Sequence, residues 1–197
     1  MQTRLYLVRH GQTQFNVEGK RQGHLDSPLT ELGKKQAAAA RDWFKKENIH
    51  LDEAWSSDLG RAVHTCQIIT EGKMPIHTSS QLQEVSYGSL DGTTLPKPPM
   101  EDWEAGAAHD YGGETFLEAW QRAHRCLMEI AGANPGKNVL VVSHSALMVM
   151  MEGLLDTVSG YERREYLPNG CVMELIYSSG RLWIEDCINP ADELQAD

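Results

Sequence analysis

The sequence predicts an α/β fold, a single three-layer domain over residues 1–197 in which helices flank a largely parallel central sheet. Two apolar runs, Arg4 to Val8 and Val139 to Val142, are typical of strands buried on both faces, and each ends in a polar pair that includes a histidine. Between them, strand and helix patterns alternate, which is the order of parallel strands joined by crossover helices. With 197 residues, 41% of them hydrophobic, the chain is long enough to bury one such core.

The segments after the first strand are predicted from their propensities and caps. Thr30 is the expected N-cap of an alanine-rich helix that runs to about residue 47. A strand is expected at 51–58 and a second helix at 58–70, capped by Ser57 or Asp58, so that Arg61 falls in or near its first turn. An irregular extended segment follows at 75–84.

A long insertion follows this third strand. Residues 92–114 are rich in proline and glycine and poor in periodicity, so we expect a loop or lid outside the core. Thr115 and Glu118 then form a capping box ahead of a helix at 116–131. The second buried strand leads into a helix at 146–155, and two strands at 171–178 and 181–188, joined by a tight turn, predict an antiparallel addition near the C-terminus.

Charge and composition exclude several classes of partner. The formal net charge of −10 disfavours nucleic acid and anionic membranes, and no stretch has the roughly 20 apolar residues of a membrane span. Four cysteines without a close CxxC pair, and an N-terminus that enters its first strand by about residue 4, predict reduced thiols and a cytoplasmic protein. A monomer and a homodimer both fit, because an edge strand near the C-terminus can pair or stay covered.

The polar residues at the ends of the predicted strands point to a phosphate site. Ligands of such sheets bind outside the carboxyl ends of the strands, where His10 and His144 can meet. Arg61, at the start of a helix after a parallel strand, faces the same edge as Arg9. Arginine suits bidentate phosphate recognition, and imidazole can act as base, donor or nucleophile. We therefore expect a small phosphorylated molecule as the ligand.

Short motifs recur along the chain in a fixed order. They are Arg9-His10-Gly11 with Thr13 and Asn16 behind it, then QGHLDSPLTELGKKQA, SSDLGRAVHT, LQEVSYGSLDG and VSHS. In this order, and across most of the chain, they resemble the motifs of the histidine phosphatase superfamily, also called the phosphoglycerate-mutase-like proteins.

This resemblance implies a phosphomonoester hydrolase of the histidine acid phosphatase type, working through a phosphohistidine on a small phosphorylated metabolite. His10 would attack phosphorus, while Arg9, Arg61 and His144 would bind the phosphoryl oxygens. Glu84 would protonate the leaving oxygen and then activate water. On the residues alone, Glu53 and Asp91 compete with Glu84 for that role. The resemblance implies no metal and no cofactor.

Five further residues are assigned to phosphate or substrate binding through the same resemblance: Asn16, Lys20, Gln22, Gly23 and Ser145. Lys20 stands where many members carry arginine, so a planar bidentate contact becomes a single ammonium. Ser145 stands where the family usually has glycine. It lacks the G-x-S-x-G frame of a nucleophilic serine, so we do not expect it to act as one.

The charge of the insertion favours hydrolysis over phosphate transfer within the substrate. From Pro98 to Glu118 the chain has six carboxylates and no lysine or arginine, which should repel a second anionic group. A neutral or cationic leaving group is expected. The alternatives are a cofactor-dependent phosphoglycerate mutase, a non-catalytic phospho-ligand binding module, and a metal hydrolase that uses His10, His144 and Glu84.

Overall fold

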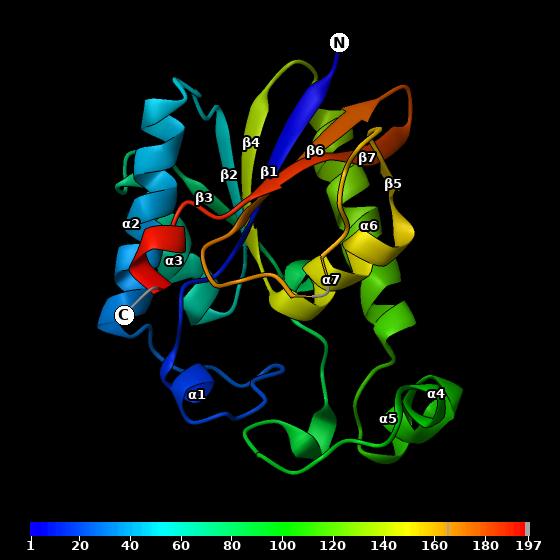
Figure 1. The fold of residues 1–197 in the computed structure, drawn as a ribbon. Coiled ribbons are helices and arrows are strands. Elements are labelled where there is room, and N and C mark those ends of the chain that lie inside the picture. Colours follow the sequence, from blue (N-terminus) through cyan, green and yellow to red (C-terminus); the bar gives the residue numbers. More distant parts are fainter. Residues whose placement is uncertain (165, 196–197) are drawn as a thin grey trace.

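A computed structural model describes residues 1–164 and 166–195, and in these residues seven strands form one sheet with the order β3-β2-β4-β1-β6-β7-β5. The strands are β1 (Thr3–Arg9), β2 (Glu53–Ser57), β3 (Ile76–Ser79), β4 (Asn138–Ser143), β5 (Asp156–Thr157), β6 (Val172–Ser178) and β7 (Arg181–Ile188). The α/β fold is confirmed (Figure 1).

Strand direction divides the sheet into two parts. Strands β3, β2, β4 and β1 are parallel to one another. Strand β6 runs antiparallel to β1, and β7 runs antiparallel to β6, which confirms the predicted addition near the C-terminus. The short β5, which we did not predict, pairs with Trp183 and Ile184 and covers part of the outer edge of β7.

Helices cover both faces of the sheet. The helices are α1 (Gln14–Val17), α2 (Glu31–Lys46), α3 (Gly60–Thr70), α4 (Met100–Asp102), α5 (Ala108–Asp110), α6 (Phe116–Ala133) and α7 (Ser145–Leu154). Shorter turns are η1 (Ser80–Leu82), η2 (Gly88–Leu90), the π-helical η3 (Trp103–Ala107) and η4 (Asp192–Gln195). None of the described helices is long and apolar enough to cross a membrane.

The buried run of β1 explains the layering. Tyr6 and Val8 belong to the core that α2 and α3 cover, while Leu5 and Leu7 belong to the core under α6 and α7. Successive strand residues point to opposite faces, so a strand covered on both sides must be apolar at every position. Figure 1 shows α2 and α3 on one side of the sheet and α6 and α7 on the other.

The cap of α3 is not the one that the sequence predicts. Leu59, rather than Ser57 or Asp58, is the N-cap residue, and its side chain has no cap hydrogen bond. Instead, Asp26 Oδ1 accepts from the backbone N–H of Arg61 at 3.2 Å. The carboxylate comes from a loop that precedes β2, so a local sequence pattern could not reveal it.

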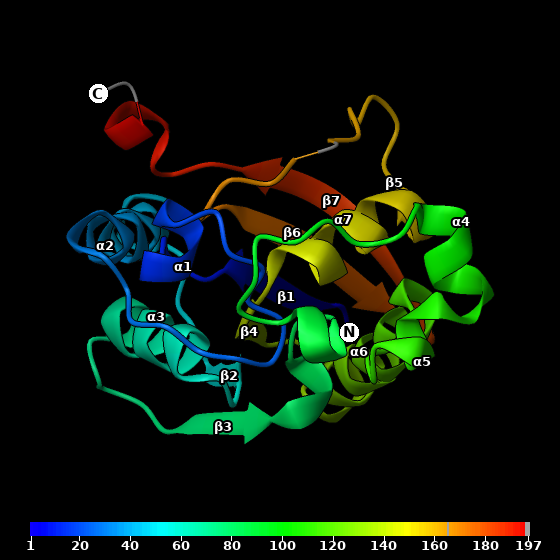
Figure 2. The same cartoon turned by 90° about the horizontal axis from the view of Figure 1, so that it is seen from below.

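The insertion at 92–114 forms α4, η3 and α5 and lies beyond the carboxyl ends of the parallel strands (Figure 1). Figure 2, which looks onto these ends, shows α4 and α5 on the same side as α6 and α7. Our expectation that it stays outside the core is wrong for Trp103, which is fully buried. Trp103 stacks on Tyr111 with ring centroids 6.0 Å apart, and its indole N–H donates to the carbonyl of Glu114 at 3.1 Å. Aromatic packing therefore fixes this segment without helical periodicity.

We expect Gly11→Ala to destabilise the protein by about 1–3 kcal/mol, because a Cβ there would lie 2.2 Å from the carbonyl oxygen of Gly33 in α2 and push the two segments apart. Urea unfolding measures this loss. The matched control is Gly153→Ala in α7, where a Cβ would meet nothing within 4 Å. The Gly153→Ala control should keep the wild-type free energy of unfolding or raise it by up to about 1 kcal/mol. Equal effects of the two substitutions would contradict this close packing.

Candidate active site

His10 is held by three contacts at the carboxyl end of β1. Its backbone N–H donates to the carbonyl of Ser143 in β4 at 3.1 Å, and its carbonyl accepts from the side chain of Asn169 at 2.9 Å. Its Nδ1 lies 2.8 Å from the carbonyl oxygen of Gly11. A carbonyl can only accept, so Nδ1 carries the proton and Nε2 of the neutral ring keeps a free lone pair.

The two histidines predicted to meet do so. The ring centroids of His10 and His144 are 5.2 Å apart, and both side chains are buried. Burial, followed by the charges of Arg61 and Arg9, holds the pKa of His10 well below its ordinary value. Burial and Arg61 also hold the pKa of His144 well below its ordinary value. Both rings are therefore neutral near pH 7.

Arg61 reaches the same edge from the first turn of α3. It is 1% exposed, and its guanidinium donates to the carbonyls of Leu25 at 2.7 Å and Gly23 at 2.9 Å. Asp26 lies 3.2 Å from Nη1 and is the ion-pair partner. Burial lowers the pKa of Arg61, and Glu84 and Asp26 oppose the shift. An arginine stays protonated in this setting, so the site keeps a buried positive charge.

Unpaired buried donors gather at this edge. In the described part of the chain, four buried side-chain nitrogens have no hydrogen-bond partner: Arg9 Nε, Arg61 Nε, and both ring nitrogens of His144. Arg9 donates from Nη1 to the carbonyl of Leu167 and lies against the ring of Tyr166. The neutral ring of His144 carries one N–H, so three of these four nitrogens are donors. Buried polar groups left without partners are costly, and an anion with several oxygens can satisfy the three donors together.

Glu84 follows β3 and η1 and is 9% exposed. Its carboxylate accepts from the backbone N–H groups of Val85 at 3.0 Å and Ala146 at 3.1 Å. Ala146 lies in the first turn of α7, two residues after His144, so the carboxylate is fixed at the N-terminus of the helix that His144 caps. Of the three carboxylates that the sequence left in competition, Glu53 instead pairs with Lys137 at 2.7 Å. Asp91 accepts from the backbone N–H groups of His24 and Tyr87.

Arg122 and Glu114 support Glu84 and were missed by the sequence analysis. Arg122 of α6 donates to the backbone carbonyls of Gln81, Gln83 and Glu84 at 2.7–2.8 Å. Its guanidinium also donates to both carboxylate oxygens of Glu114, from Nη2 at 2.6 Å and from Nε at 3.0 Å. The carbonyl of Glu84 accepts a further bond from His24 Nε2 at 2.9 Å. No local motif marks Arg122, because all its partners except Glu114 lie about 40 residues earlier.

Asn16 and Lys20 differ in their relation to the site. Asn16 Oδ1 accepts from the backbone and hydroxyl of Thr13 at 3.0 Å and 3.1 Å, so its amide N–H groups point elsewhere as donors. Asn169 Nδ2 lies 3.5 Å from the same oxygen and links Asn16 to the carbonyl of His10. The Lys20 ammonium instead pairs with Glu18 at 2.7 Å and lies over the ring of Phe15. These contacts of Lys20 involve none of Arg9, His10, Arg61 and His144.

Of the other predicted binding residues, Gly23 accepts from Arg61 through its carbonyl, and Ser145 follows His144 in the chain. Gln22 is buried and accepts from the hydroxyl of Ser27 at 3.2 Å. Gly23 has φ +51°, and a Cβ there would come within 1.8 Å of an Asp91 oxygen, so only glycine fits. Ser145 begins α7 and lines a cavity beside Glu84. Among the described residues, no group of three histidine, cysteine or acidic side chains is arranged to hold a metal.

The order of these elements along the chain matches a known family. The model of the histidine phosphatase superfamily (branch 1) matches residues 5–189, from β1 to just beyond β7. The chain belongs to this superfamily. Its two buried histidines, its two arginines and Glu84 all lie within the matched region.

Relatives of this superfamily member include mutases and phosphatases. The probable phosphoglycerate mutase GpmB of Salmonella paratyphi A is 30% identical over 206 residues, which cover 98% of this chain and 95% of that protein. The structure of phosphoglycerate mutase from Bacillus anthracis has a TM-score of 0.81 at 25% identity and covers 94% and 92% of the two chains. Mycobacterial glucosyl-3-phosphoglycerate phosphatase, in complex with VO3, has a TM-score of 0.71 at 27% identity and covers 94% and 98%.

The neutral histidines of this superfamily member should make its stability depend on pH. Below about pH 6.5 the unfolded chain protonates both, whereas the folded chain keeps them neutral because their pKa values are depressed. Stability is therefore fully present above pH 6.5 and falls as the pH drops toward the folded pKa values. The expected loss is about 1.4 kcal/mol per pH unit for each histidine. Urea unfolding at pH 7.5, 6 and 5 measures it.

Two variants isolate this contribution. His144→Gln removes one of the buried histidines, so the slope of stability against pH should decrease by about 1.4 kcal/mol per pH unit. His50→Gln changes a side chain that is 88% exposed and should keep the wild-type slope. If His144→Gln also kept that slope, His144 would not be neutral in the folded protein.

Proposed function

We propose that this protein is a phosphomonoester hydrolase that works through a phosphohistidine at His10 on a small phosphorylated metabolite. The observation that carries the proposal is the set of four unpaired buried nitrogens on Arg9, Arg61 and His144, beside a histidine whose Nε2 is free. A phosphoryl group has three oxygens for the N–H groups of Arg9, Arg61 and the neutral His144 ring, and a phosphorus for the nucleophile.

In the first step His10 Nε2 attacks phosphorus, and the bond from phosphorus to the ester oxygen breaks. Arg9, Arg61 and His144 bind the three equatorial oxygens, whose charge they stabilise in the transition state. The ester oxygen leaves with a proton from the carboxylic acid of Glu84. The alcohol departs and the phosphoryl group stays on His10.

In the second step the Glu84 carboxylate takes a proton from water. The water oxygen attacks phosphorus, the bond to His10 Nε2 breaks, and inorganic phosphate leaves. Glu84 is again an acid, and the net reaction is ester plus water to alcohol plus phosphate. The Arg122 contacts to the backbone at Glu84 hold this side chain where it can act on both oxygens in turn.

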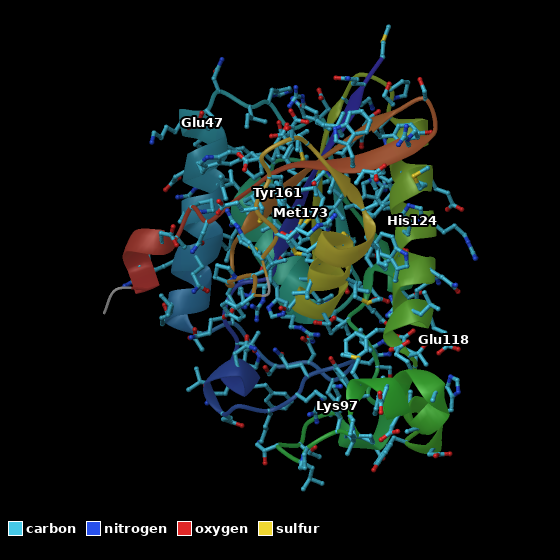
Figure 3. All side chains as sticks on the ribbon, turned by 45° about the vertical axis from the view of Figure 1, so that its right-hand side comes forward. Glu47, Lys97, Glu118, His124, Tyr161 and Met173 are labelled. Carbon is cyan, nitrogen blue, oxygen red and sulfur yellow. The ribbon has the colours of Figure 1, made fainter. Side chains whose placement is uncertain are left out.

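Phosphoglycerate mutase activity is the second candidate, and two observations favour it. Relatives carry that name, and two cations lie near the site although residues 98–118 contain none. Arg21 lies over the ring of Tyr87, and Lys97, which Figure 3 labels beside the insertion, lies over the rings of Trp103 and Phe116. Interconversion of 2- and 3-phosphoglycerate faster than release of phosphate would favour the mutase.

We expect hydrolysis of nitrophenyl phosphate to persist in excess chelator and to fall by at least about 10³-fold in His10→Ala. Rapid acid-free quenching after reaction with labelled substrate should trap a phosphoenzyme that is stable in base and labile in acid, and His10→Ala should form none. Turnover abolished by chelator would overturn the proposal in favour of a metal hydrolase. A circular dichroism spectrum equal to that of the wild type shows that the variant is folded.

Glu84→Gln should slow alkyl phosphates by about 10²–10⁴-fold, because their leaving oxygen needs a proton. The leaving group of nitrophenyl phosphate is far less basic, so the rate at which this substrate forms the phosphoenzyme should fall much less. Single-turnover measurements of alcohol release compare the two. Equal losses would contradict the role of Glu84 as the acid, and Glu53→Gln is the control that should leave both rates unchanged.

A further inference from the structure

A cavity of about 560 Å³ opens beside Glu84, where the alcohol of a phosphomonoester would depart. Its walls are mostly apolar and include Tyr87, Phe116, Leu117, Val149 and Met150. They come from the segment after η1, the start of α6 and one side of α7. Because Glu84 itself and Ser145, the residue after His144, line this cavity, it adjoins the proposed catalytic site.

The α7 wall extends away from the acid as an apolar stripe. Ala146, Val149, Met150 and Leu154 all line the cavity. Their spacing of three and four residues places them on one helix face, one above another. Eight residues of rise separate the first from the last, so the stripe is about 12 Å long. It begins at Ala146, whose N–H binds the Glu84 carboxylate.

The charges around the cavity disfavour an anionic leaving group. Its charged lining residues within the described chain are Glu84 and Glu104, both acidic. Glu104 accepts from the backbone N–H of Phe116 at 2.7 Å and is thereby fixed at the N-terminus of α6. A second phosphate or carboxylate inside the cavity would meet these two carboxylates. Arg21 and Lys97, the cations that favour the mutase alternative, lie over aromatic rings of the cavity wall but are not among its lining residues.

Large apolar side chains stand exposed at the cavity. Met100, Leu117 and Leu154 are 51%, 50% and 54% exposed, and all three line it. They come from three different helices, α4, α6 and α7. Apolar groups gathered in this way around one opening indicate a site that binds an apolar partner.

We infer that the substrate is the phosphate ester of an uncharged, apolar alcohol or phenol, whose hydrocarbon body lies along the α7 stripe while its ester oxygen meets Glu84. This inference rests on the proposed function and specifies its substrate class. Ser145, at the start of the stripe, is the polar lining residue nearest to His144 in the chain and can bond an oxygen close to the ester.

Straight-chain alkyl phosphates test the inference, because their leaving groups are equally basic and differ only in length. We expect kcat/KM to rise about threefold to fourfold per methylene from ethyl to hexyl phosphate, and to level off once the stripe is covered. 3-Phosphoglycerate is the anionic comparison and should be poorer than butyl phosphate. A flat series, or a preference for 3-phosphoglycerate, would overturn the inference.

Two leucine variants test whether the far end of the stripe binds the alkyl chain. Leu154→Asp should reduce kcat/KM for hexyl phosphate by about tenfold or more and leave ethyl phosphate unchanged. Leu194→Asp, an exposed leucine in η4 beside α2 on the opposite face, should change neither. Equal effects of the two variants on hexyl phosphate would overturn the inference.

Failure of the apolar subsite and failure of the proposed hydrolase activity would give different results. If ethyl, hexyl and nitrophenyl phosphates were all hydrolysed at similar efficiency through His10, the hydrolase would stand and the apolar subsite would fall. If no phosphomonoester were hydrolysed, the proposed function itself would fall.

Discussion

The parallel pairing of β1 with β4 sets Arg9 opposite Ser143, and this register brings His10 and His144 to one edge of the sheet. The same edge receives the first turn of α3, with Arg61. Two guanidinium groups and two imidazoles are thus buried together, and the carboxylates of Glu84, Asp26 and Asp91 act on Arg61. Burying so many donors without full pairing costs stability, which the apolar cores on both sides of the sheet offset. In return, the donors are already in place for an oxyanion and need no rearrangement when charge develops.

Helix α7 connects three parts of the site. His144 is its N-cap residue, the N–H of Ala146 holds the Glu84 carboxylate, and Val149 and Met150 line the cavity beyond. Displacement of this helix would therefore move His144, the Glu84 carboxylate and the apolar wall together. The second anchor of Glu84, the proposed acid, is independent of α7, because Arg122 of α6 binds the backbone carbonyls of Gln83 and Glu84. Fixing one carboxylate from two helices limits its motion to the small range that proton transfer tolerates.

The sequence was enough to predict those features that local chemistry determines. Apolar runs ending in Arg9-His10 and Ser143-His144 revealed the buried strands and their shared edge, and the Thr115 cap located α6 correctly. It could not reveal contacts between distant segments. The Asp26 cap of α3, the Arg122 clamp on Glu84 and the bond from Asn169 to His10 each join residues 35 or more positions apart, without a periodic signal. The burial of Trp103 was missed for a related reason, since a segment held by aromatic stacking lacks the spacing of a helix or strand. The binding role that the resemblance gives Lys20 stays a prediction, and in this structure its ammonium pairs with Glu18.

The two ends of the proposed substrate are selected by different physical effects. The net charge of −10 makes the protein as a whole repel anions, so the phosphoryl end depends on donors buried within a few ångströms of His10. The hydrocarbon end would meet an apolar surface and the carboxylates of Glu84 and Glu104. Apolar area that leaves water favours the binding of this end, and the two carboxylates oppose the binding of an anionic group there. Inorganic phosphate retains only the first set of interactions, and the free alcohol retains only the second. If the proposed function holds, each product would therefore bind more weakly than the ester that joins them, which favours the release of both after hydrolysis.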